Sequence, residues 1–258
     1  MYVLITGASS GIGLEMARVF AQQKKDLILV ARNKKALEEL AQQIRDQYSV
    51  QVRVVSTDLT ETNAAQALFD LTEARSWPVE TLVNNAGFGD FSLYVDEKWE
   101  RINSMVQLNI TALLQLTRLY LPKMKASNSG NILNVASTAG FQPGPYMAVY
   151  YASKAFVLSF TEALHEELRG TGIKVSTLCP GPTESNFLKA ANIDDVPLFK
   201  MTKLPTSKEV AIYGVDALHA NQSVAIHGWL NFMLMQLSRF MPRSLIVKLV
   251  RSLQEKRK

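Results

Sequence analysis

Short apolar runs recur along the chain and alternate with longer stretches in which apolar residues recur every three or four positions. The first pattern predicts buried strands and the second predicts helices with one buried face. The predicted strands cover residues 2–5, 27–31, 50–56, 81–84, 131–137, 173–178 and 223–228. A helix follows the glycine turn that ends at Gly13, and further helices are predicted over 36–48, 61–74, 97–125 and 150–169.

Strand and helix follow one another without a Pro- or Ser-rich linker, an internal repeat or a low-complexity segment. This order favours an α/β fold with one doubly wound parallel sheet. The length of 258 residues, with 47% apolar residues, suits one large domain with an ample core. We therefore expect a single domain over residues 1–258, with a C-terminal helical extension over 229–258.

The net charge of +5 is concentrated at the C-terminal end. Residues 239–258 hold seven Arg or Lys and one Glu, whereas residues 1–238 hold 21 basic and 22 acidic residues. Nucleic-acid binding by the body is therefore not expected. The single cysteine, Cys179, is interpreted as a buried structural thiol.

The three histidines, His165, His219 and His227, have no metal-ligand spacing, so no metal site is predicted. The N-terminus shows no basic region or cleavage signal before the first apolar run. Without such a signal, we expect the protein to be located in the cytoplasm.

The first predicted strand ends in Thr6-Gly7-Ala8-Ser9-Ser10-Gly11-Ile12-Gly13, and a helical pattern begins there. Glycines allow close approach of the backbone to an anion, and the N–H groups and dipole of a helix N-terminus hold phosphate. An ordinary strand–helix turn is the alternative, and the strand before and the helix after argue against it. We expect Gly7, Ser9, Ser10, Gly11, Ile12 and Gly13 to bind the cofactor.

The second predicted strand is followed by Arg32. In dinucleotide-binding folds an acidic residue about 20 residues after the glycines binds the ribose 2′-hydroxyl, whereas an arginine accommodates a 2′-phosphate. With Arg32 here and no carboxylate nearby in the sequence, the pattern favours NADP(H) over NAD(H).

Tyr150 and Lys154 are four residues apart on a predicted helix and share one face. Tyr151 is out of phase, because its partner four residues on is Ala155. A nearby ammonium lowers the pKa of a phenol from about 10 by roughly 1–3 units, which makes tyrosine a usable acid or base for a carbonyl/alcohol pair. A second Tyr-x-x-x-Lys match, over 94–98, is interpreted as a solvated helix start.

Two further polar residues stand out. Ser137 ends a predicted strand, and open α/β sheets bind ligands at the carboxyl ends of their strands. Asn109 lies within an apolar helical run, where it is either a satisfied core group or a positioned functional one.

Taken together, these motifs resemble the short-chain dehydrogenase/reductase family over about residues 1–187. The resemblance rests on the ordered blocks Thr6–Gly13, Asp58, Asn84-Asn85-Ala86-Gly87, Asn109, Ser137, Tyr150-x-x-x-Lys154 and Pro180-Gly181. It implies a Rossmann fold, an NAD(P)-dependent oxidoreductase activity and a homodimer or homotetramer. Within the family the sequence is similar to the 3-ketoacyl and hydroxysteroid reductase branches, but this similarity does not define a substrate.

The resemblance also implies a role for each catalytic residue. Tyr150 is expected to be the acid/base, and Lys154 to lower its pKa and contact the nicotinamide ribose. Ser137 is expected to hold the substrate oxygen, and Asn109 to support a water relay to Lys154.

The remaining cofactor contacts are likewise implied by the resemblance. Asp58 and Leu59 are expected at the adenine, and Asn85, Ala86 and Gly87 around the adenosine ribose. Pro180, Gly181 and Thr183 are expected to flank the nicotinamide amide. Where the family often has Thr five residues after the proline, this chain has Ser185, so the carboxamide contact is open between Thr183 and Ser185.

The resemblance places a substrate lid over residues 185–210, which would face residues 141–147. This interval is rich in apolar residues, as a lipophilic substrate would require, although a lid that packs on its own protein has the same composition. Lys189 and Lys200 lie in the lid, so a polar substrate that carries a carboxylate remains the alternative.

The extension over 229–258 is apolar and basic, but polar residues interrupt it too often for a membrane-spanning helix of about 20 apolar residues. Three interpretations of the extension are open: it packs on the body or a sister subunit, it lies on a membrane surface, or it forms a wall of the substrate pocket. The packing interpretation is favoured.

We therefore predict an NADP(H)-dependent oxidoreductase that interconverts a ketone and a secondary alcohol, with a hydrophobic substrate. A dehydrogenase for small polar hydroxy acids or sugars is one alternative. A non-catalytic, cofactor-sensing regulator on the same fold is the other, and the presence of Tyr150, Lys154 and Ser137 together argues against it.

Overall fold

The computed structural model describes residues 1–185, 187, 191 and 204–255. The first half of the chain forms β1 (Tyr2–Thr6), α1 (Gly11–Gln22), β2 (Asp26–Ala31), α2 (Lys34–Tyr48), β3 (Val52–Ser56), α3 (Ala64–Ala74), β4 (Val79–Asn84) and α4 (Trp99–Val106). The second half forms α5 (Leu113–Ser127), β5 (Gly130–Val135), α6 (Ala148–Glu167), β6 (Ile173–Cys179), α9 (Ser207–His219), β7 (Val224–Ile226), α10 (Trp229–Ser238) and α11 (Arg243–Gln254).

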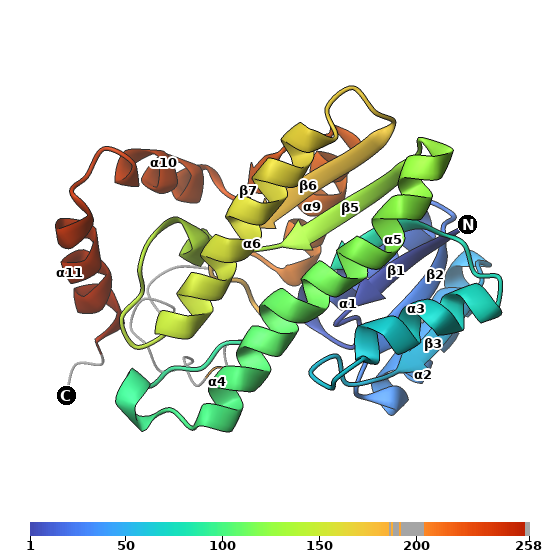
Figure 1. The fold of residues 1–258 in the computed structure, drawn as a ribbon, viewed down its shortest axis with the longest axis horizontal. Helices are drawn as coiled ribbons and strands as arrows, with labels where there is room; N and C mark the ends of the chain where they lie inside the picture. Colours follow the sequence, from blue (N-terminus) through green and yellow to red (C-terminus); the bar gives the residue numbers. More distant parts are fainter. Residues whose placement is uncertain (186, 188–190, 192–203, 256–258) are drawn as a thin grey trace.

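The strands of the described residues form one seven-stranded sheet in the order β3-β2-β1-β4-β5-β6-β7 (Figure 1). Every pair of neighbouring strands is parallel. The strand order reverses between β1 and β4, and ligands bind at such a point in open α/β sheets. The predicted doubly wound parallel sheet, and with it the α/β fold class, is confirmed.

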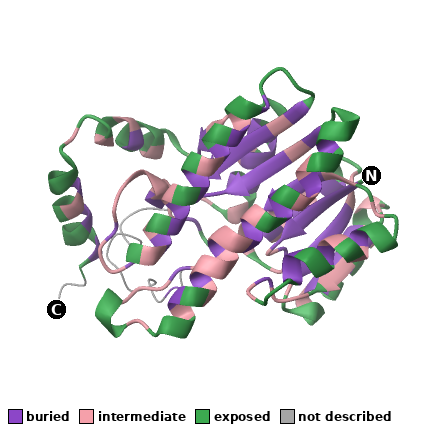
Figure 2. Cartoon of the chain, viewed as in Figure 1, coloured by how far each residue is buried: buried purple, intermediate pink, exposed green. Residues whose placement is uncertain are grey.

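Helices cover both faces of the sheet, and the alternation of side chains along each strand explains how. In β1, Val3 and Ile5 face a core shared with α1, α2 and α9. Leu4, on the other face, belongs to a core shared with α3, α5 and α6. Because both faces are covered, all five residues of β1 are buried, and the strands form the buried centre in Figure 2.

Most boundaries differ from the prediction by a few residues, and three differences are larger. α9 was not predicted, and its first turn overlaps the interval assigned to the lid. The predicted helix over 97–125 is divided by a π-helical turn, Gln107–Ala112. The strand that leads to Ser137 ends at Val135, so Ser137 lies in the loop beyond the strand and caps a short 3-10 turn, Thr138–Phe141.

The C-terminal extension consists of α10 and α11, which extend away from the sheet on one side of the molecule (Figure 1). Its buried residues are Met235 on α10, and Ile246, Val250 and Gln254 on α11. Among the described residues, no helix has the length and apolar character needed to cross a membrane.

Candidate active site

The loop between β1 and α1 has a backbone that requires glycine. Gly7 and Gly11 have φ values of +67° and +57°, in the left-handed region that favours glycine. A Cβ on Gly13 would lie 2.4 Å from Nδ2 of Asn85 and 2.5 Å from the carbonyl oxygen of Gly7. The glycines therefore permit both the turn and the close contact between β1, α1 and the loop after β4.

The loop after β4 is tied to the glycine loop by one hydroxyl and one amide. The Thr6 hydroxyl oxygen accepts hydrogen bonds from the backbone N–H groups of Asn85 and Ala86, both at 3.0 Å. Nδ2 of Asn85 donates to the carbonyl oxygens of Thr6 and Gly7, at 2.8 and 3.2 Å. In the structure the Asn85 side chain shapes the loop, and its predicted contact with the cofactor stays a prediction. The role of Thr6 was missed, and its position at the start of the glycine motif was the available signal.

The same loop fits a dinucleotide pyrophosphate. α1 begins at Gly11 and carries no acidic residue in its first turn. Within the described part of the chain, the side chain of the N-cap residue Ser10 makes no capping hydrogen bond, which leaves N–H groups of the first turn available. Such a helix start is favourable for an anion. Ser9 and Ile12 lie in this loop and first turn, as predicted.

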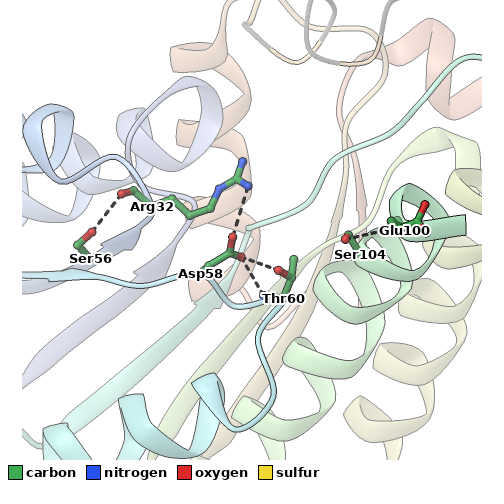
Figure 3. Close-up of polar contacts among 6 residues, drawn as sticks. All are labelled: Arg32, Ser56, Asp58, Thr60, Glu100 and Ser104. Atoms are coloured by element: carbon green, nitrogen blue, oxygen red, sulfur yellow. Dashed lines mark hydrogen bonds and ion pairs between the residues drawn. The ribbon is translucent and has the colours of Figure 1, made fainter. Parts of the chain in front are cut away.

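Arg32 and Asp58 lie side by side at the carboxyl ends of β2 and β3 (Figure 3). Nη1 of Arg32 is 3.5 Å from Oδ2 of Asp58, and the Arg32 side chain is 76% exposed. Ser56 donates a hydrogen bond to the Arg32 carbonyl oxygen at 3.0 Å, which fixes the backbone from which the guanidinium extends. The sequence offered no carboxylate close to Arg32, and the fold supplies one from the next strand.

The Asp58 carboxylate is held in place from the other side by Thr60. The Thr60 backbone N–H and hydroxyl donate to Oδ1 at 3.0 and 2.9 Å. Burial alone raises the pKa of the Asp58 carboxyl, but the Thr60 hydrogen bonds and the positive charge of Arg32 outweigh burial and lower it below its ordinary value. Asp58 therefore stays ionised. Leu59, beside it, is buried.

Asn109 lies on the π-helical turn and is only 2% exposed. Its Oδ1 accepts from the Phe88 N–H at 3.1 Å, and its Nδ2 donates to the Phe88 carbonyl oxygen at 3.0 Å. Nδ2 also donates to the Ser153 hydroxyl at 3.0 Å. A Cβ on Gly87 would lie 3.0 Å from Oδ1 of Asn109 and 3.3 Å from Nζ of Lys154. Asn109 thus holds the loop after β4 against the helix that carries Tyr150.

Tyr150, Lys154 and Ser137 come together at the carboxyl end of β5, and all three are buried. The Ser137 hydroxyl lies beside the Tyr150 phenol, where it favours the ionised form of the phenol, and donates to the Pro180 carbonyl oxygen at 3.4 Å. Nζ of Lys154 donates to the Val135 carbonyl oxygen at 2.8 Å and lies 5.8 Å from the Tyr150 ring centroid. The predicted shared face of Tyr150 and Lys154 is therefore present.

The electrostatics of this group differ from the sequence-based prediction. Burial raises the pKa of the Tyr150 phenol above its ordinary value, and the Ser137 hydrogen bond only partly opposes the effect. Burial lowers the pKa of the Lys154 ammonium to about 8. The predicted lowering of the Tyr150 pKa is therefore wrong for the protein alone, because burial raises that pKa. The Lys154 ammonium is directed to the Val135 carbonyl oxygen.

Apolar side chains surround the Tyr150 ring. Its cluster contains Met105, Ala139, Met147 and Ala191, with Phe88, Phe91 and Phe187 packed against it. The Phe187 and Tyr150 ring centroids are 5.4 Å apart. Sequence reasoning placed Phe187 in the lid, and its ring is found directly against the tyrosine.

The segment after β6 borders the same site. The Pro180 carbonyl oxygen accepts from the Thr138 N–H at 2.9 Å. The buried Thr183 donates its hydroxyl to the Gly181 carbonyl oxygen at 2.9 Å, and the Ser185 hydroxyl donates to the Thr183 carbonyl oxygen at 3.4 Å. Most of the predicted lid, including Lys189 and Lys200, lies outside the described residues.

The C-terminal extension reaches this site through two contacts that no sequence pattern indicated. Nε2 of Gln254 donates to the Tyr151 hydroxyl at 2.5 Å. The Tyr146 hydroxyl donates to Oε1 of Glu255 at 3.0 Å. The end of α11 is thereby fixed against the helix of Tyr150 and the loop before it.

Comparison with known proteins agrees with the class that this fold and site define, a dinucleotide-binding oxidoreductase. The family profile described as short chain dehydrogenase matches residues 1–195. A ketoacyl reductase of Nostoc sp. is 32% identical over 216 residues, which are 84% of this chain and 74% of that protein.

Two solved structures extend the similarity over nearly the whole chain. A short-chain dehydrogenase from Sphingobium yanoikuyae in complex with NADPH has 33% identity, a TM-score of 0.82 and 93% coverage of each chain. A 7beta-hydroxysteroid dehydrogenase has 26% identity, a TM-score of 0.88 and 96% coverage of each chain. The chain belongs to the short-chain dehydrogenase family and is an oxidoreductase of that type.

Proposed function

We propose that the protein is an NADP(H)-dependent oxidoreductase that interconverts a ketone and a secondary alcohol, with a hydrophobic carbonyl compound as substrate. The observation that carries the proposal is the Tyr150 phenol, which lies beside the Ser137 hydroxyl inside an apolar cluster at the carboxyl end of the sheet. A proton donor in apolar surroundings suits a substrate whose only polar group is the reacting oxygen.

The proposed roles follow from the contacts. A bound nicotinamide supplies or accepts the hydride. The Ser137 hydroxyl orients the substrate oxygen, and the Tyr150 phenol gives its proton to that oxygen in reduction and takes it back in oxidation. Because burial raises the Tyr150 pKa, the phenol is protonated at neutral pH and is ready to donate. Lys154, with its pKa lowered to about 8, lies behind Tyr150 and is the group from which we expect the phenol to regain its proton.

NADP(H) is proposed because of Arg32. Its guanidinium is exposed at the carboxyl end of β2, where the adenosine ribose of a dinucleotide lies in this fold. The pair with Asp58 orients the guanidinium and leaves most of its surface open, so it can also bind a 2′-phosphate. The solved relative from Sphingobium yanoikuyae, which holds NADPH, supports the same choice.

The hydrophobic substrate is proposed because of the cluster around Tyr150. Met147, Phe187 and the Tyr150 ring converge on Gly89, since a Cβ there would lie 3.0 Å from Cε of Met147, 3.2 Å from Cζ of Phe187 and 3.1 Å from Cδ2 of Tyr150. An apolar substrate group replaces such contacts at low cost, whereas a carboxylate would lose its hydration. The similarity to a ketoacyl reductase and a hydroxysteroid dehydrogenase supports this choice.

The cofactor is tested by comparing NADPH and NADH in the reduction of cyclic and long-chain ketones. A charge-assisted contact of about 1.5–3 kcal/mol favours NADPH by roughly 10–150-fold in kcat/KM. Arg32→Asp should reverse that preference, whereas Arg75→Asp, at the exposed end of α3, should leave it unchanged. Equal use of NADH and NADPH by the wild-type protein contradicts the cofactor assignment.

The substrate class is tested with the same assay and a matched set of carbonyl compounds. We expect kcat/KM to rise with the apolar size of the ketone and to be low for 2-keto acids and sugars. A preference for the polar compounds contradicts the hydrophobic assignment. An absence of turnover with every compound, despite tight NADPH binding, supports the regulator alternative.

A further inference from the structure

The outer surface of α10 is apolar to a degree that is unusual for a protein surface in water. Of its ten residues only Met235 is buried. Trp229, Leu230 and Leu237 are 75%, 67% and 59% exposed, and Phe240, just beyond the helix, is 86% exposed. Contiguous apolar patches of this kind mark interaction sites, because isolated soluble proteins rarely expose them.

The neighbouring helix continues this surface. On α11 the buried stripe is Ile246, Val250 and Gln254, of which Gln254 contacts Tyr151. A second stripe with the same spacing of four, Leu245, Leu249 and Leu253, is 44–51% exposed. One face of α11 is therefore used in packing, and a second apolar stripe beside it remains open to solvent. The exposed sides of both helices are visible in Figure 2.

The open stripe is accompanied by positive charge. Arg239, Arg243, Lys248 and Arg251 are exposed along this segment, and Glu255 is the acidic residue that follows them in the described part. Lys248 lies one turn from Leu245 on α11, so its ammonium can extend beside the apolar stripe. The charge is thus near the apolar surface, while the rest of the chain is close to neutral.

The apolar residues and the positive charge together indicate what binds to this surface. A two-fold contact through α11 would bring Arg243, Lys248 and Arg251 of two copies near one another, and like charges repel. The apolar residues include Trp229 stacked on Phe232, with ring centroids 5.9 Å apart. Aromatic and leucine side chains together with Lys and Arg are typical of helices that lie in the interface of an anionic membrane.

We propose that α10 and α11 form a docking surface for an anionic lipid membrane, with the helices lying along the bilayer surface. Trp229, Leu230, Leu237 and Leu249 enter the acyl region, and Arg243 and Lys248 contact lipid phosphates. The inference does not rest on the proposed substrate or cofactor. The Gln254–Tyr151 hydrogen bond links the docked segment to the helix of Tyr150, so docking holds the active site at a constant position relative to the bilayer.

The test is co-sedimentation of the full chain with vesicles of phosphatidylcholine containing phosphatidylglycerol, and with vesicles of phosphatidylcholine alone. The wild-type protein should bind the anionic vesicles, bind the neutral ones much more weakly, and be released as salt is raised. Failure to bind anionic vesicles, or equal and salt-independent binding to both kinds, overturns the proposal.

Matched variants separate the charge from the apolar surface. Arg243→Gln with Lys248→Gln should weaken binding by about 25-fold, at roughly fivefold per charge. The control pair Arg75→Gln with Lys125→Gln removes the same charge from the exposed ends of α3 and α5 and should change binding little. Equal effects of the two pairs contradict a local docking surface.

The apolar part is tested by Leu230→Ser, which should weaken binding by about tenfold or more. Ile212→Ser, at a 40% exposed position on α9, is its control. Both variants should keep the melting temperature and NADPH binding of the wild type, since neither leucine nor isoleucine is buried. A fall in the mass of the wild-type oligomer on Leu230→Ser, without any vesicle binding, shows an interface between copies and overturns the membrane assignment.

Discussion

Replacing Asn109 by alanine tests whether this side chain holds the active-site loop to the catalytic helix. The change removes three hydrogen bonds, two to the Phe88 backbone and one to the Ser153 hydroxyl, at 3.0–3.1 Å. Each lost hydrogen bond leaves a partly or fully buried group without its partner. Such a loss costs about 1 kcal/mol, which is the low end of the usual range. The expected loss of unfolding free energy is therefore about 3 kcal/mol.

For a domain of this size such a loss lowers the melting temperature by roughly 6–12 °C. Turnover should also fall, because the Ser153 hydroxyl in turn donates to the Tyr150 carbonyl oxygen at 2.7 Å. The assay is thermal unfolding of Asn109→Ala beside Asn103→Ala, an exposed asparagine on α4. If the two variants differ by less than about 0.5 kcal/mol, the spread of ordinary surface substitutions, the role given to Asn109 is refuted.

Two further changes probe the cofactor loop and the buried lysine. In Gly13→Ala the new methyl group lies 2.5 Å from the Gly7 carbonyl oxygen, so the loop must shift to relieve the overpacking. NADPH binding should therefore weaken at least about tenfold, which fluorescence titration measures. Gly170→Ala is the control: it strains a backbone with a φ of +80°, but its methyl group meets no atom within 4 Å and it precedes β6, at the edge of the sheet opposite the site. It should keep wild-type NADPH binding, and equal losses in the two variants would contradict the role given to the glycine loop. Burial lowers the Lys154 pKa from 10.5 to about 8. Between pH 8 and pH 10.5 the unfolded chain therefore binds more protons than the folded one. The free energy of unfolding of the wild type, relative to that of Lys154→Met, should rise over this pH range. Urea unfolding at several pH values measures this difference, and a flat or falling difference contradicts a buried, neutralisable lysine.

The strands and most helices were predictable because each has a local signature. β1 and β2 are short apolar runs buried on both faces, and α2 carries Leu37, Leu40 and Ile44 on one stripe. α9 had a signature too, since Thr206 and Glu209 form a capping box, but the interval was assigned to the lid and the signal was overlooked.

The missing parts of the site depend on contacts between residues far apart in the sequence. Arg32 and Asp58 meet because β2 and β3 are neighbours in the sheet, and Gln254 meets Tyr151 because α11 returns to the body. The pKa of Tyr150 was predicted with the wrong sign for the same reason. The helix phase of Lys154 is local information, but the burial that raises the Tyr150 pKa is a property of the whole fold.

The most direct test of the proposed chemistry is the turnover number for NADPH-dependent ketone reduction in Tyr150→Phe and Tyr151→Phe. The Tyr150 phenol contacts Ser137, whereas the Tyr151 hydroxyl is occupied by Gln254. Loss of a general acid costs about 10²–10⁴ in rate, so Tyr150→Phe should show a loss of that size and Tyr151→Phe a much smaller one. Equal losses in the two variants, or wild-type turnover in Tyr150→Phe, would contradict the assignment of Tyr150 as the proton donor.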